Sequence, residues 1–122
     1  MHELLRRHIA SYDQLELLLL LRAERARWCP EPWLEDKRPG MLDALQHLVE
    51  QRLVVERDGT GERLYQYNPP DEQIARAIDH LATVYRNQPH EVMRVMTANA
   101  VERVRSQAAR TFGEVLGKKH ES

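Results

Sequence analysis

The segment from residue 41 to residue 67 constrains the fold most, because its apolar pattern changes from a helical period to that of strands within a few residues. Residues 53–55 are rich in β-branched side chains, and residues 58–62, with Gly59 and Gly61, supply turn chemistry before the strand-like residues 63–67. The segment therefore predicts a helix from Pro39 or Gly40 to Gln51, followed directly by a β-hairpin with a five-residue tip. Apolar residues mark one face of that helix: Met41, Leu42, Leu45, Leu48 and Val49.

Upstream, the sequence predicts a leucine-rich helix and a short second helix. Ser11 and Gln14 have the spacing of a capping box, so the first helix should start at Ser11 and run to about Arg27. Leucines at positions 15–21 cover more than one face of this helix. Pro30 and Pro32 end it, because neither has an amide donor, and they leave room for a short helix over residues 31–36.

Two more helices are predicted after the hairpin. The first carries an apolar stripe from Ile74 to Tyr85, and the second covers residues 90–116, which contain no proline and one glycine, with Gly117 as its cap. We therefore expect a mainly helical α+β protein. Residues 1–70 should form one domain and residues 71–122 a C-terminal helical arm.

Composition excludes several classes of protein. The 122 residues include one cysteine, Cys29, so a disulfide framework is not possible. The longest aliphatic run, residues 17–21, is far shorter than the roughly 20 residues that cross a bilayer. We therefore expect a cytoplasmic chain with no membrane partner. The net charge of −1 gives no overall attraction for polyanions, so any binding of nucleic acid has to be local.

A leucine-rich helix, a short helix, a turn, a third helix and a hairpin follow one another over about residues 9–68. In this order of elements the chain resembles the small winged helix-turn-helix transcriptional regulators of bacteria. The resemblance implies a winged helix-turn-helix with two additional C-terminal helices. It also implies binding of double-stranded DNA, with the third helix in the major groove and the hairpin against flanking phosphates.

Three parts of the sequence would contact DNA if the resemblance holds. Arg57 and Arg63 in the hairpin would contact phosphates, and Lys37 and Arg38 precede the third helix. The helix face opposite Leu45 presents Asp43, Gln46, His47 and Glu50. With Arg52, which follows that helix, the predicted DNA-binding residues are Lys37, Arg38, Gln46, His47, Arg52, Arg57 and Arg63.

A second function stays open, because carboxylates are numerous where DNA would bind. Residues 1–70 contain 10 Lys and Arg against 12 Asp and Glu, and Asp43 and Glu50 lie on the face that would enter the groove. Carboxylates repel phosphates and can only accept hydrogen bonds from bases. The alternative is a protein-interaction module of winged-helix shape that regulates a partner without binding DNA.

The last helix also predicts self-association. A long amphipathic helix on a small chain exposes an apolar stripe unless something covers it. We expect a homodimer in which the C-terminal helices and the helix containing Leu15 and Leu21 pack against their symmetry mates. The alternative is a last helix that folds back on the helix before it.

The sequence offers no constellation for catalysis. Gly59 and Gly61 precede a strand, whereas a phosphate-binding glycine loop precedes a helix, and the six histidines lack metal-ligand spacing. Cys29 before Pro30 is either a thiolate ligand or a small buried hydrophobic residue. We therefore expect no enzymatic activity, no metal and no cofactor.

Overall fold

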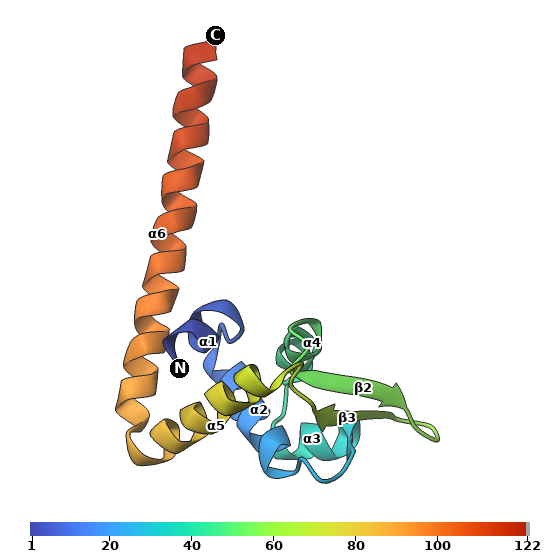
Figure 1. Cartoon of the computed structure of the whole chain (residues 1–122). Coiled ribbons are helices and arrows are strands. Elements are labelled where there is room, and N and C mark those ends of the chain that lie inside the picture. Colours follow the sequence, from blue (N-terminus) through green and yellow to red (C-terminus); the bar gives the residue numbers. More distant parts are fainter. Residues whose placement is uncertain (122) are drawn as a thin grey trace.

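The protein has a mainly helical α+β fold, as predicted (Figure 1). The computed structural model describes the backbone of residues 1–121 and the side chains of residues 1–111. The described elements are α1 (His2–Arg7), α2 (Tyr12–Ala23), β1 (Cys29–Pro30), α3 (Glu31–Lys37), α4 (Leu42–Glu50), β2 (Val54–Asp58), β3 (Arg63–Tyr67), α5 (Glu72–Asn87) and α6 (Pro89–Glu121).

The strands form a small antiparallel sheet in the order β1-β3-β2. The predicted hairpin is confirmed, with Val54 opposite Tyr67 and Asp58 opposite Arg63. Because Asp58 is still paired, the tip consists of residues 59–62 and is one residue shorter than predicted. The third strand, β1, was not predicted, since a two-residue strand that includes a proline has no detectable period.

α2 is the central helix of the core. Its start is confirmed, because the Ser11 hydroxyl accepts from the amide of Gln14. It ends at Ala23 rather than near Arg27, and Glu24 is its C-cap. The helix packs against α4 and β3, and four of its leucines are buried inside this one chain: Leu15, Leu17, Leu18 and Leu21. These four are therefore not free to cover a symmetry mate, and only Leu19 and Leu20 stay half-buried.

α1 is a helix that the sequence analysis did not predict. It has six residues, too few to show an apolar period, yet it buries Leu4 and Leu5 and packs against α5 and α6. Arg103 of α6 donates to the backbone oxygen of Ala10, at 3.2 Å. The N-terminal segment is therefore joined to the C-terminal helices.

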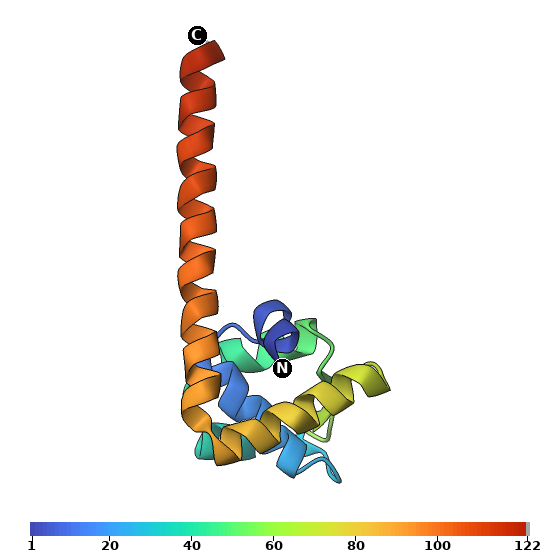
Figure 2. The ribbon, with the colours of Figure 1, turned by 60° about the vertical axis from the view of Figure 1, so that its left-hand side comes forward.

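α6 begins within the core and then leaves it as a single long helix (Figures 1 and 2). Val92, Val95 and Met96 are buried, whereas Val101 and Val104 are exposed. The prediction that Gly117 caps this helix is wrong, because the helix continues through both glycines to Glu121. The apolar stripe that the sequence predicts on this helix includes Phe112 and Val115, whose side chains lie outside the part that the structure describes. No helix in the described part of the chain has the length and apolar character to cross a membrane.

Candidate functional site

α4 presents one polar face beside the hairpin. Ala44, Leu45 and Leu48 are buried against α2 and the sheet, so the helix is fixed by its apolar side. The opposite side exposes Asp43, Gln46 and Glu50, and next to them Leu42 is 46% exposed. The polar face of this helix is thus an acidic one.

His47 is turned away from that face. Its side chain is half-buried, and its Nε2–H donates to the backbone oxygen of His8 at 2.9 Å. The ring of His8 in turn lies 2.8 Å, through Nδ1, from the side-chain oxygen of Gln51. These bonds tie the segment between α1 and α2 to α4, so the Nε2–H of His47 is already used within the chain.

The hairpin arginines predicted to contact phosphates have partners within the chain. Arg63 pairs with Glu56 at 2.7 Å and with Asp58 at 3.6 Å, and its hydrogen bond to Glu56 raises the pKa of the guanidinium. Arg57 lies over the Trp28 ring, with 4.2 Å between its Cζ and the ring centroid. Arg63 is therefore paired within the hairpin, and Arg57 contacts the segment that precedes β1.

Arg52 occupies the turn between α4 and β2 and is exposed. Its φ of 63° lies in the left-handed region, which is uncommon for a residue other than glycine. This turn lets the helix lead directly into the first strand of the hairpin. Arg52 lies beside the hairpin arginines in the chain, but it is not among the residues that line the grooves described next.

A groove of about 520 Å³, here called the α4–hairpin groove, separates α4 from the hairpin. Three carboxylates line it, and the one cation is Arg63. Burial and the negative charges of Glu31 and Glu56 raise the pKa of Tyr65, which also lines the groove. The complete lining is Glu31, Leu42, Gln46, Val49, Glu50, Glu56, Arg63 and Tyr65.

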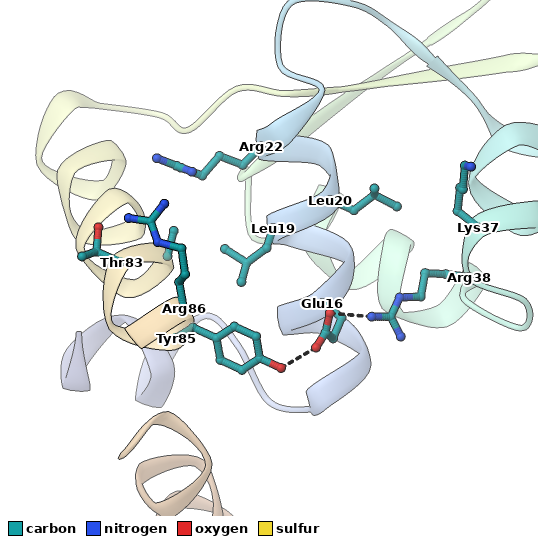
Figure 3. Close-up of a pocket in the computed structure, with 10 residues that line it drawn as sticks. Glu16, Leu19, Leu20, Arg22, Lys37, Arg38, Thr83, Tyr85 and Arg86 are labelled. Carbon is teal, nitrogen blue, oxygen red and sulfur yellow. Dashed lines mark hydrogen bonds and ion pairs between the residues drawn. The ribbon is translucent and has the colours of Figure 1, made fainter. Parts of the chain in front are cut away.

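A second groove, of about 550 Å³, lies along the outer side of α2 and is here called the α2 groove (Figure 3). Lys37 and Arg38 lie here, whereas Gln46 and Arg63 line the α4–hairpin groove. The other predicted DNA-binding residues line neither groove: His47, Arg52 and Arg57. Four cations and one carboxylate line it. Its lining is Glu16, Leu19, Leu20, Arg22, Lys37, Arg38, Ala82, Thr83, Tyr85 and Arg86.

Glu16 is the polar centre of the α2 groove. It pairs with Arg38 at 2.5 Å and accepts from the Tyr85 hydroxyl. Burial opposes its ionisation, but hydrogen bonds with Tyr12 and Tyr85 and the charge of Arg38 outweigh burial and lower the pKa of Glu16. Burial and the bond to Glu16 raise the pKa of Tyr85. The network holds α2, α5 and the end of α3 together.

Sequence reasoning missed Glu16, Arg22 and Arg86 as site residues. Arg22 pairs with Asp79 of α5 at 3.0 Å, and Glu16 meets Tyr85, so both contacts join residues that are far apart in the chain. The apolar stripe of α5 up to Tyr85 showed that this helix packs on something. It gave no sign of which helix the neighbouring Arg86 would face.

Metal and thiol chemistry receive no support from the described residues. They contain no group of three His, Cys, Asp or Glu side chains that could hold a metal ion. Cys29 is 1% exposed, and burial raises the pKa of its thiol, so it is the small buried hydrophobic residue of the two alternatives.

Comparison of the chain with models of known families, with curated proteins and with solved structures finds no match. What the structure defines is the class of fold, a small α+β domain with a three-stranded antiparallel sheet. Its function has to be inferred from the two grooves.

Proposed function

We propose that the chain has a winged helix-turn-helix fold in which α3 and α4 form the helix-turn-helix and the β2–β3 hairpin is the wing. The element order supports this assignment, as does the packing of α2 across α4. The tight turn at Arg52 leads α4 into the hairpin, and β1 extends the sheet on the side of β3. α1, α5 and α6 are then additions to that fold.

The function that the geometry supports best is a regulatory module that binds a cationic segment of a protein partner in the α4–hairpin groove. One observation carries this proposal: Glu31, Glu50 and Glu56 line the groove, and its one cation, Arg63, is already paired with Glu56. A groove lined by charges of one sign attracts ligands of the opposite sign.

Apolar surface in the same groove favours Lys and Arg side chains over small cations. Leu42 is 46% exposed and Val49 is half-buried. Lys and Arg pack their aliphatic stems on such surface while the charged end reaches a carboxylate. The partner segment is therefore expected to be rich in these two residues.

Duplex DNA is disfavoured at this groove for the same reason. Affinity for DNA depends on cations that neutralise phosphates, and carboxylates work against it. Lys37 and Arg38 line the other groove, and the Nε2–H of His47 is held by His8. The two acids of α4, Asp43 and Glu50, would face the DNA instead.

The test uses the full chain with a fluorescein-labelled peptide rich in Lys and Arg, at a salt concentration of about 50 mM, where screening is weak. We expect binding that weakens by roughly tenfold or more in the variant Glu50→Lys/Glu56→Lys, because both carboxylates become cations. Glu72→Lys/Glu102→Lys is the matched control, since both acids are exposed and lie outside the groove. Peptide binding that is absent, or equal in both variants, would overturn the proposal.

A second candidate is a transcriptional regulator that binds duplex DNA as a homodimer. The observation in its favour is that Arg52, in the turn after α4, and Arg57, in β2, are exposed and form no ion pair with the described carboxylates. Val101 and Val104, 45% and 68% exposed, offer α6 as the dimer contact. Duplex DNA binding that falls steeply with salt and is reduced in Arg52→Ala/Arg57→Ala would establish this candidate instead.

A further inference from the structure

The α2 groove combines a leucine floor with cations on either side. Figure 3 shows Leu19 directed toward α5 and Leu20 directed toward Lys37 and Arg38. Both leucines are half-buried, while the leucines on the inner side of α2 are fully buried. α2 therefore presents an apolar strip to solvent between two flanks, one from α5 and one from the end of α3.

Two of the four cations form ion pairs with carboxylates, and two do not, although the Nζ of Lys37 lies 5.7 Å from the centroid of the Trp33 ring. Arg22 is held by Asp79 at 3.0 Å and Arg38 by Glu16 at 2.5 Å. Lys37 and Arg86, one on each flank, form no ion pair with any carboxylate among residues 1–111. The groove thus holds unneutralised positive charge on both sides of an apolar strip.

We propose that the α2 groove is a docking site for an acidic amphipathic helix of a protein partner. Such a helix carries an apolar stripe flanked by polar faces, and it binds by laying that stripe into a groove. Its stripe would cover Leu19 and Leu20, and carboxylates beside the stripe would reach Arg86 on one flank and Lys37 on the other. The proposal does not depend on what the α4–hairpin groove binds.

Charge and apolarity select this occupant over two others. The exposed part of α6 in a second copy is rich in arginine, with Arg103, Arg105 and Arg110, so its charge would be repelled by the groove. Nucleic acid would meet the cations, but phosphates gain nothing from two leucines at the centre. An acidic partner helix satisfies the cations and covers the leucines at the same time.

The experiment measures binding of two designed helical peptides to the full chain by fluorescence anisotropy. Both peptides carry the same leucine stripe; one has Glu beside it and the other has Lys. We expect the Glu peptide to bind and the Lys peptide not to compete with it. Lys37→Glu/Arg86→Glu should weaken binding of the Glu peptide by roughly tenfold or more, and Leu20→Gln should also weaken it.

The matched control is Arg76→Glu/Arg94→Glu, because these two arginines are exposed and lie outside the groove. It should leave binding of the Glu peptide within a factor of about two. Far-ultraviolet circular dichroism and thermal melting of each variant verify that the fold is retained. The proposal is overturned if the Glu peptide does not bind, if the groove variant binds it as well as the control does, or if duplex DNA rather than the peptide loses affinity in the groove variant.

Discussion

The α4–hairpin groove and the α2 groove are similar in volume and opposite in charge. The first is lined by three carboxylates and one paired arginine, and the second by four cations and one paired carboxylate. A single short helix contributes to both. α3 brings Glu31 at its N-terminus to the first groove and Lys37 at its C-terminus to the second, which is also the arrangement that the helix dipole favours.

This comparison shows why the net charge of −1 says little about what the protein binds. The charges nearly cancel over the whole sequence, but in the folded chain some of them line two grooves of opposite sign. The fold does not fix the ligand either, because function depends on the residues that line the site.

The largest expected effect comes from Leu34, the buried residue of α3, the helix that contributes side chains to both grooves. Leu34→Ala should lower the free energy of unfolding by about 2–5 kcal/mol, because it leaves a cavity under the helix. Urea denaturation measures the loss, and peptide binding should weaken at both grooves. An effect on one groove alone would show that α3 does not couple them.

A smaller effect, confined to the α2 groove, is expected for Glu16→Gln. Removing the partner of Arg38 and Tyr85 should cost about 1–3 kcal/mol of stability at pH 7. The pKa of Glu16 is lowered in the folded chain, so its contribution is present above its ordinary pKa of 4.5 and is lost as the pH falls through the lower folded value. The difference between wild type and variant should therefore shrink in acid. A difference that is independent of pH would contradict the ion pair.

Val104→Asp tests whether the oligomeric state can change without a change in peptide binding at the grooves. Val104 is 68% exposed on α6 and lines neither groove. If α6 forms the homodimer contact, sedimentation velocity should show a shift from dimer to monomer, while peptide binding at both grooves stays unchanged. A variant that remains dimeric would rule out this part of α6 as the contact.

The smallest effect is expected for Arg63→Ala, which removes one of the two hairpin arginines that the sequence analysis placed against DNA phosphates. Arg63 is exposed and already paired with Glu56, so the melting temperature should not change measurably. Its removal exposes the charge of Glu56, and a Lys- and Arg-rich peptide should bind slightly more tightly. Weaker peptide binding, or a reduced salt dependence of DNA binding, would favour the DNA-binding candidate.

Local patterns in the sequence predicted the elements well. The stripe from Met41 to Val49 and the paired strands after it appear as α4 and the hairpin, and the Ser11 cap starts α2. The misses have physical causes. α1 and β1 are too short to show a period. α6 does not end at Gly117, because the helix continues to Glu121.

The candidate site was harder to predict than the fold. The exposure of Gln46 and the acidity of α4 follow from helical spacing around Leu45. The positions of Lys37 and Arg38 do not, because they depend on contacts between α2, α3 and α5 that the sequence does not specify. The internal bond of His47 likewise depends on the unpredicted segment around His8.

The most direct test of the two-groove account is a single methyl-NMR titration of the leucine-labelled full chain. Leu42 reports on the α4–hairpin groove and Leu20 on the α2 groove. We expect a Lys- and Arg-rich peptide to shift the methyl signals of Leu42 and not those of Leu20, and the acidic helical peptide to shift those of Leu19 and Leu20 and not those of Leu42. If both peptides shift the same methyls, or if duplex DNA shifts Leu42 as strongly as the basic peptide does, the account is contradicted.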